Sequence, residues 1–113
     1  MIINKTKNKI ISEKEIVCRS GISQARGLMF RKRKNLIMIF NRERKISLHN
    51  FFVFYPIDIL VLNNNKIIVE IKRNFRPFTL WNSKKRGSYL IELGFTSDYE
   101  LGDRLNIKLN SKF

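Results

Sequence analysis

The chain has 113 residues, which is enough for one domain with a single core. Its 23 Lys and Arg residues outnumber nine Asp and Glu residues, so the formal net charge is +14. Because 43% of the residues are hydrophobic, a disordered basic tail is excluded.

The sequence predicts neither a membrane span nor a disulfide or metal centre. The longest apolar run, residues 51–62, is interrupted by Pro56 and Asp58 and is shorter than the roughly 20 residues that cross a bilayer. The first residues lack the apolar segment of a signal peptide, so we expect a cytoplasmic protein with no membrane partner. Cys18 and His49 are the single cysteine and the single histidine, so we expect no metal and no cofactor.

Most of the predicted elements are short strands rich in β-branched and apolar residues. In chain order they span residues 10–19, 36–40, 47–53, 57–62, 66–72, 89–93 and 104–109. A single short helix is predicted near residues 22–28, with Ser20 or Ser23 as its N-cap.

Residues 57–72 predict an antiparallel hairpin. The first strand is apolar on both faces, which is typical of a central strand, and the second alternates between apolar and charged residues. Residues 63–65 are three asparagines, and asparagine tolerates the positive φ angles of tight turns. The elements together predict one mainly β domain over residues 1–113, α+β at most, built as a small antiparallel barrel-like sheet with helix below about a fifth of the chain.

The whole net charge falls in two stretches, here called the basic windows. Residues 19–45 hold nine bases against one acid, and residues 72–86 hold six bases against none. Such clustering favours a polyanionic partner. The candidate nucleic-acid-binding residues are Arg31, Lys32, Arg33, Lys34, Arg73, Arg76, Trp81, Lys84, Lys85 and Arg86.

Several aromatic residues in the second window have two interpretations. Trp81 lies among bases and could stack on an unpaired nucleobase, although it could also pack in the core. Phe75 and Phe78 are expected to be core residues.

A ligand groove is the alternative site, and its candidates are His49, Asn50 and Asp58. Asp58 lies between two isoleucines, so a structural role with a hydrogen-bonding partner is favoured over a catalytic one. Glu92 and Asp103 are interpreted in the same way. No combination of residues identifies a catalytic centre, so the sequence does not decide whether the protein is an enzyme.

Three motifs, in this order, resemble those of a known family. They are Arg26 to Arg31, the aromatic stretch His49 to Leu60 with its Pro56-Ile57-Asp58 sequence, and Tyr89 to Leu93 followed by Gly102 to Leu105. Over about residues 9–110 the chain resembles the family called domain of unknown function 192, or uncharacterised protein family 0127. The resemblance implies a single β-rich domain with one short helix and brings no biochemical activity with it.

The expected function is non-catalytic association with nucleic acid. RNA is favoured over DNA because the predicted helix is too short to read a major groove. The alternatives are a domain that binds or converts a small anionic ligand in a groove near His49, Asp58 and Trp81, and a protein-interaction module that uses the strand around residues 51–55 as an edge. The oligomeric state is left open by the sequence.

Overall fold

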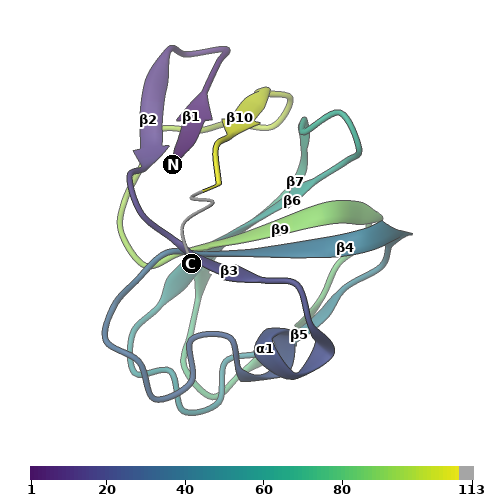
Figure 1. Cartoon of the computed structure of the whole chain (residues 1–113). Helices are drawn as coiled ribbons and strands as arrows, with labels where there is room; N and C mark the ends of the chain where they lie inside the picture. Colours follow the sequence, from purple (N-terminus) through teal and green to yellow (C-terminus); the bar gives the residue numbers. More distant parts are fainter. Residues whose placement is uncertain (110–113) are drawn as a thin grey trace.

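The structure is a computed structural model and describes residues 1–109. It is mainly β, with 47% strand and 5% helix, as predicted (Figure 1). The strands are β1 (Ile2–Asn4), β2 (Lys9–Ser12), β3 (Ile16–Cys18), β4 (Leu36–Arg44), β5 (Ser47–His49), β6 (Ile57–Leu62), β7 (Ile68–Phe75), β8 (Leu80–Asn82), β9 (Gly87–Leu93) and β10 (Leu105–Ile107), and the helix is α1 (Gly21–Arg26).

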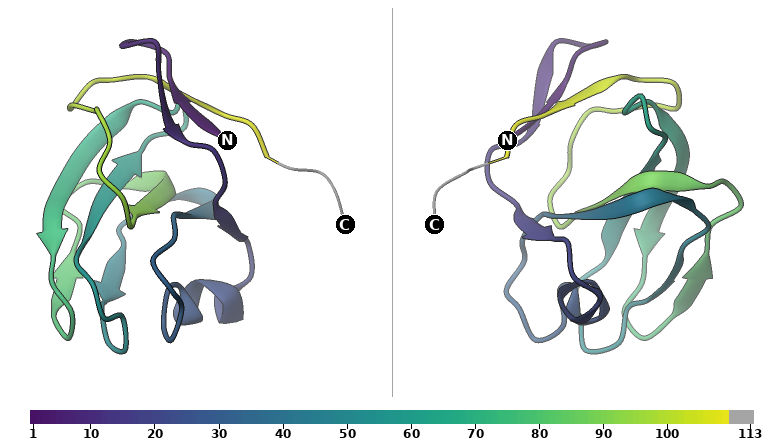
Figure 2. Two further views of the ribbon diagram at one scale, coloured as in Figure 1. Left: turned by 90° about the vertical axis from the view of Figure 1, so that its left-hand side faces the viewer. Right: turned by 45° about the vertical axis from the view of Figure 1, so that its right-hand side comes forward.

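The strands form three sheets that do not close into a barrel. The central sheet has the order β3-β4-β9-β6-β7, in which only β3 and β4 are parallel. The sheet β10-β1-β2 lies beyond one end of the central sheet, whereas α1 and β5 lie at the other end (Figures 1 and 2). We call the latter the helix end of the molecule.

Both faces of the central sheet are buried, because its strands are apolar on both sides. Along β6, Ile59 and Val61 pack into one core cluster with Leu28 from the helix end. Leu60 and Leu62 point the other way, into a second cluster. The prediction that β6 is a central strand is therefore confirmed.

The hairpin of β6 and β7 is also confirmed. The carbonyl of Asn63 accepts a hydrogen bond from Lys66 N–H at 2.9 Å, and the Asn63 side chain accepts from the N–H groups of Asn65 at 2.9 Å and Ile67 at 3.1 Å. The residue with positive φ is Lys66, at 61°, rather than one of the asparagines. The asparagines thus support the turn through side-chain acceptors.

Helix α1 begins one residue after its cap. Ser20 Oγ accepts from Ser23 N–H at 3.1 Å, and the Ser23 side chain accepts from Ser20 N–H, which completes a capping box. The helix ends at Arg26 because Gly27 follows with φ 49° and ψ −124°, a conformation that suits glycine.

Two of the predicted strands have different bounds in the structure. The expected strand over residues 10–19 is split into β2 and β3, which belong to different sheets. The expected strand over residues 47–53 ends at His49, because the backbone of Asn50 bonds to another loop instead of to a neighbouring strand. The edge strand proposed around residues 51–55 is therefore a loop.

Candidate functional site

Three loops meet at the helix end and are joined by hydrogen bonds between their backbones. They are residues 29–34, 50–54 and 76–79. Phe30 N–H donates to Phe52 O at 2.8 Å, Phe78 N–H donates to Asn50 O at 2.8 Å, and Asn50 N–H donates to Thr79 O at 2.9 Å. The Asn50 amide also donates to the carbonyl of residue 75 at 3.0 Å and the residue is only 1% exposed, so it holds the loops together.

The loops present an aromatic cluster, which we define as Phe30, Phe51, Phe52, Phe54 and Phe78. The rings of Phe30 and Phe52 are stacked at 4.9 Å between centroids, and the Phe78 ring lies 5.8–6.4 Å from the rings of Phe51, Phe52 and Phe54. All five side chains are exposed, Phe30 by 66% and Phe78 by 53%. Phe75 is a core residue as predicted, but the prediction that Phe78 is buried is wrong.

Three members of the cluster have left-handed backbone conformations. The φ angles are 57° for Phe30, 59° for Phe52 and 60° for Phe78. Such angles are uncommon for bulky residues, and conformations of this kind gather at functional sites. A contiguous exposed apolar patch is also typical of an interaction surface. Both observations identify the aromatic cluster as a candidate binding surface.

The first basic window contributes four cations to one of these loops. In the described part of the chain, the side chains of the loop's two arginines are hydrogen-bonded to the protein, whereas those of its two lysines are not. Arg31 Nε donates to Gly27 O at 3.1 Å, and Arg33 Nη1 donates to Gly94 O at 2.7 Å. Lys32 and Lys34 are exposed, and within residues 1–109 their side chains make no hydrogen bond or ion pair. The arginines thus stabilise the loop, and the lysines are accessible to a partner.

The second basic window lies mainly on and after β7. The guanidinium of Arg73 lies 4.6 Å from the Tyr99 ring centre and donates to the Tyr99 carbonyl at 3.3 Å. Arg76 is exposed and is the first residue of the loop 76–79. The turn between β8 and β9 holds three exposed bases, and the Glu70 carboxylate accepts two of their backbone N–H groups. These three bases are Lys84, Lys85 and Arg86.

The two windows reach the cluster from opposite edges of the central sheet. Arg19, Arg42 and Arg44 line a recess beside β3 and β4, whereas Lys72, Arg73 and Arg76 line another beside β7. The two windows therefore follow different edges of the central sheet. They meet at two places: their loops reach the aromatic cluster, and Arg44 at the end of β4 pairs with Gly87, next to Arg86.

Trp81 and His49 lie close to the cluster but differ in exposure. Trp81 is half-buried in β8 and packs against the core, so the core interpretation fits it better than stacking on a base. The exposed His49 ring stacks on Phe51 at 5.3 Å, and its Nδ1 accepts from Phe51 N–H at 3.2 Å.

A recess of about 270 Å³ opens beside these loops. Its apolar lining includes Leu28, Met29, Met38 and Val53, and its polar lining includes His49 and Glu92. The structure thus brings together two of the three groove candidates, His49 and Asn50, and adds Glu92, which the sequence did not distinguish from a structural carboxylate.

Glu92 is a buried residue whose carboxyl group borders the recess and has no partner among residues 1–109. The residue is 6% exposed, and no hydrogen bond or ion pair reaches its side chain from anywhere in the described part of the chain. Desolvation by burial raises the pKa of Glu92 to about 7. Burial is the main reason why the pKa values of Cys18 and Tyr55 are raised. The Glu92 carboxylate raises both further, and Arg31 lowers both.

Asp58 occupies a separate site. Its Oδ1 accepts from Asn74 N–H at 2.9 Å, and its Oδ2 accepts from the Tyr99 hydroxyl. Burial, and then the Asp58 carboxylate, raise the pKa of Tyr99. These contacts are of the kind that a structural Asp58 requires. Asp58 lines a recess of about 190 Å³ that contains neither His49 nor Trp81, so the groove expected from these three residues does not form.

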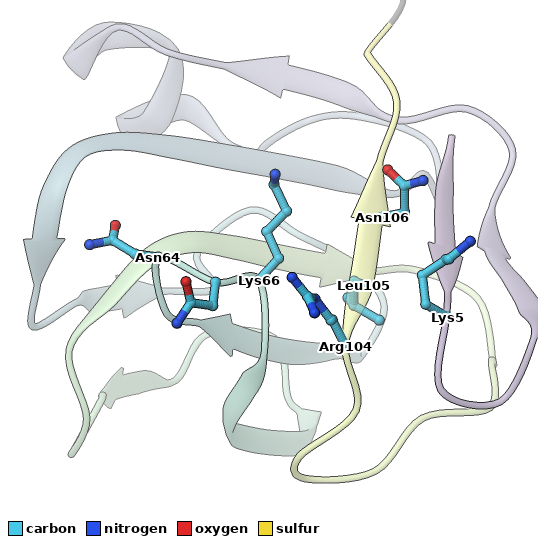
Figure 3. A pocket seen from close by; sticks show the side chains of 7 residues that line it. Lys5, Asn64, Lys66, Arg104, Leu105 and Asn106 are labelled. Carbon is cyan, nitrogen blue, oxygen red and sulfur yellow. The ribbon is translucent and has the colours of Figure 1, made fainter.

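A wider recess of about 390 Å³ lies at the other end of the fold, against β10. It includes the cations Lys5, Lys66 and Arg104 among its lining residues. Figure 3 shows that the side chains of Lys5 and Arg104 point away from each other. Lys5 and Arg104 therefore do not converge on one anion.

Neither a metal centre nor a membrane span is found in residues 1–109. The His, Cys, Asp and Glu residues there form no group of three that could hold a metal ion. No helix of that region is long and apolar enough to cross a bilayer.

The fold and site define a small, basic, single-domain β protein with a candidate binding surface of exposed phenylalanines. Residues 2–107 match the family DUF192, described as Uncharacterized ACR, COG1430, and the chain belongs to this family. The resemblance noted in the sequence is confirmed. The family has no known function.

Archaeal relatives carry the family name without an activity. A UPF0127 protein of Pyrococcus horikoshii is 35% identical over 95 residues, which cover 81% of this chain and 82% of that protein. A UPF0127 protein of Thermococcus sibiricus is 32% identical over 114 residues, which cover 94% of this chain and 73% of that protein.

Two crystal structures share the fold. A protein of unknown function from Novosphingobium aromaticivorans has a TM-score of 0.80 at 18% identity, covering 94% of this chain and 82% of that one. A Sinorhizobium meliloti protein, for which a role as transcription regulator has been suggested, has a TM-score of 0.77 at 19% identity, covering 93% of this chain and 88% of that one. At these identities the likeness shows the fold alone.

Proposed function

We propose that this protein binds single-stranded RNA, with little sequence preference, through the aromatic cluster and the cations around it. The observation that carries the proposal is the cluster itself: five exposed phenylalanines on three joined loops, next to accessible lysines and arginines. Surfaces that combine aromatic rings with bases bind single strands, because nucleobases stack on the rings and phosphates pair with the cations.

The distribution of charge favours a nucleic acid over a lipid surface. The basic windows run along both edges of the central sheet and converge at the cluster. A flexible polyanion can follow such a path from one edge across the cluster to the other. A flat bilayer would contact the helix end alone and would leave most of the cations unused.

The secondary structure favours a single strand. The helix has six residues, which is too short for a recognition helix in a major groove. Unpaired RNA exposes base faces to aromatic side chains, whereas a duplex hides them.

The test replaces one ring without disturbing its backbone. Phe78→Asn removes the aromatic group and keeps a residue that tolerates the φ of 60°. Loss of one stacked base should cost about 1–3 kcal/mol, or roughly 5- to 160-fold in affinity. Phe95→Asn is the matched control, because Phe95 is 53% exposed like Phe78 and lies outside the cluster. Binding to a labelled single-stranded RNA is measured by fluorescence anisotropy at physiological salt.

Each outcome decides the proposal. Weaker RNA binding by Phe78→Asn, with no change in Phe95→Asn, supports it. No RNA binding by the wild type overturns it, as does an equal effect of the two substitutions. Phosphatidylserine vesicles are tested in parallel, and binding to vesicles but not to RNA would replace the proposal with a membrane-surface function.

A further inference from the structure

The three motifs that relate the chain to its family meet at the recess of about 270 Å³, although they are far apart in sequence. The first motif contributes Gly27 and Met29, the second contributes His49 and Val53, and the third contributes Glu92. The aromatic cluster lies on the loops outside this recess. The recess is therefore a second candidate site, and it does not depend on RNA binding.

The other buried polar groups of the recess are already bonded to the protein. The Gln24 amide donates to Cys18 O at 3.3 Å and to Ile39 O at 3.1 Å. The Asn50 amide donates to a backbone carbonyl at 3.0 Å. Within the described part of the chain no donor reaches the Glu92 carboxyl, and since no fully buried side-chain oxygen there lacks a partner, its oxygens are open to the recess.

Gly27 keeps the Glu92 carboxyl accessible from the recess. A Cβ atom at position 27 would lie 3.9 Å from Glu92 Oε1 and 3.8 Å from Met38 Cε. These distances are ordinary van der Waals contacts, and the positive φ of Gly27 disfavours any larger residue, so the backbone keeps other side chains away from the carboxyl at this point.

The neighbouring base does not neutralise Glu92. Arg26 borders the recess in the last turn of α1, but it is exposed and makes no ion pair with Glu92. An isolated carboxylate in low dielectric is costly, and an N–H-donating cation next to it removes this cost. A carboxylate on the ligand would instead face a second carboxylate.

We propose that this recess binds a small molecule with a compact apolar body and a cationic, N–H-donating head group, an amidinium or primary ammonium, that pairs with Glu92. The apolar body packs against the Leu28, Met29, Met38 and Val53 side chains. The volume of about 270 Å³ is below the range of drug-sized sites, so the ligand is small.

The test compares three probes of one size that differ only in head group: benzamidinium, benzyl alcohol and benzoate. Binding is followed by NMR titration of the isotope-labelled full chain. We expect benzamidinium to bind at millimolar concentration or below, and to shift the amide signals of Gly27, His49 and Glu92. Benzyl alcohol should bind at least tenfold more weakly, and benzoate should not bind at this site.

Glu92→Gln keeps the shape of the side chain and removes its charge. We expect it to weaken benzamidinium binding at least tenfold, while the matched control Glu13→Gln, an exposed acid away from the recess, binds as the wild type does. Equal binding of benzamidinium and benzoate overturns the proposal, as do unchanged affinity in Glu92→Gln and no benzamidinium shift at these residues. If Glu92→Gln did not fold, the three probes on the wild type would decide alone.

Discussion

At the scale of single residues, Glu92 and Asp58 show how one residue type takes two roles. Both are carboxylates on strands of the central sheet. Asp58 accepts hydrogen bonds from Tyr99 and Asn74, whereas Glu92 has no donor among the described residues and borders a recess. The sequence shows isoleucine or leucine on both sides of each, so neighbours in the chain do not distinguish them. Contacts from distant segments of the chain distinguish the two carboxylates.

Glu92 should make stability depend on pH. Its ordinary pKa of 4.5 applies in the unfolded chain, and the folded value is about 7. Between these values the folded state retains a proton that the unfolded state releases, so the free energy of unfolding falls as pH rises from about 4.5 to about 7 and stays lower above it. The difference corresponds to about 3 kcal/mol.

Urea unfolding of the wild type and of Glu92→Gln, at pH 4 and at pH 8, measures this effect. Gln does not titrate, so the stability of the variant relative to the wild type should rise by about 3 kcal/mol between the two pH values. The other ionisable groups are common to both proteins and cancel in the difference. A relative stability that does not change with pH would contradict a buried, unpaired Glu92.

Asp58→Ala should destabilise the fold. It leaves the Tyr99 hydroxyl and the Asn74 N–H without their acceptor, which costs about 1–3 kcal/mol. Asp58→Asn retains an oxygen for one donor and should cost less. Both values come from chemical denaturation, and a wild-type stability in both variants would show that these hydrogen bonds contribute nothing.

At the scale of secondary-structure elements, local patterns predicted more than long-range contacts did. The run of β-branched residues and the Asn-rich turn identified β6 and β7 and their pairing, since a hairpin joins neighbouring residues. The strands β1 and β8 have three residues each, which is too short for a clear local pattern, and both pair with distant segments, β1 with β10 and β8 with β5, although β1 also pairs with the nearby β2.

The candidate site was predicted only in part, because it too depends on contacts between segments that are distant in the sequence. The sequence placed bases and aromatics near one another, but it predicted that Phe78 is a core residue and left Trp81 open between stacking on a base and packing in the core. The exposure of Phe78 follows from the bond between its N–H and Asn50 O, which joins two loops 28 positions apart. A spacing of three residues between aromatics cannot reveal such a bond.

Substitutions in the hairpin test the register of the central sheet. Ile59 is 0% exposed and Val69 is half-buried. Ile59→Asp should cost about 4 kcal/mol or more, because an unpaired charge enters the core, and Val69→Asp should cost about half as much. Thermal melting ranks the variants, with Ile59→Val as the conservative control at about 0.5–1.5 kcal/mol. Equal melting temperatures for the two Asp variants would contradict the register.

At the scale of the whole molecule, charge and aromatic surface occupy defined regions. The cations flank both edges of the central sheet and meet at the phenylalanines of the helix end. The proposed function therefore depends on an arrangement of three loops rather than on one sequence motif. Net charge alone would predict binding without any preferred place on the surface.

Salt dependence measures how many phosphates the loop lysines contact. If Lys32 and Lys34 each contact one phosphate of a single strand, Lys32→Gln with Lys34→Gln should reduce the slope of log affinity against log salt by about 1.4, at about 0.7 for each contact. Lys5→Gln with Lys9→Gln removes the same charge from exposed lysines elsewhere and should leave the slope almost unchanged. Equal slopes for the two double variants would argue against a phosphate path through this loop.

The most direct test of the RNA-binding surface is an NMR map of the protein during titration with a single-stranded RNA at physiological salt. We expect the amide signals that shift most to belong to residues 29–34, 50–54 and 76–79, the three loops at the lower end of Figure 1. The sheet of β1, β2 and β10, at the upper end, should shift little. The largest shifts in that sheet, or shifts spread evenly over the basic surface, would contradict the aromatic cluster as the RNA-binding site.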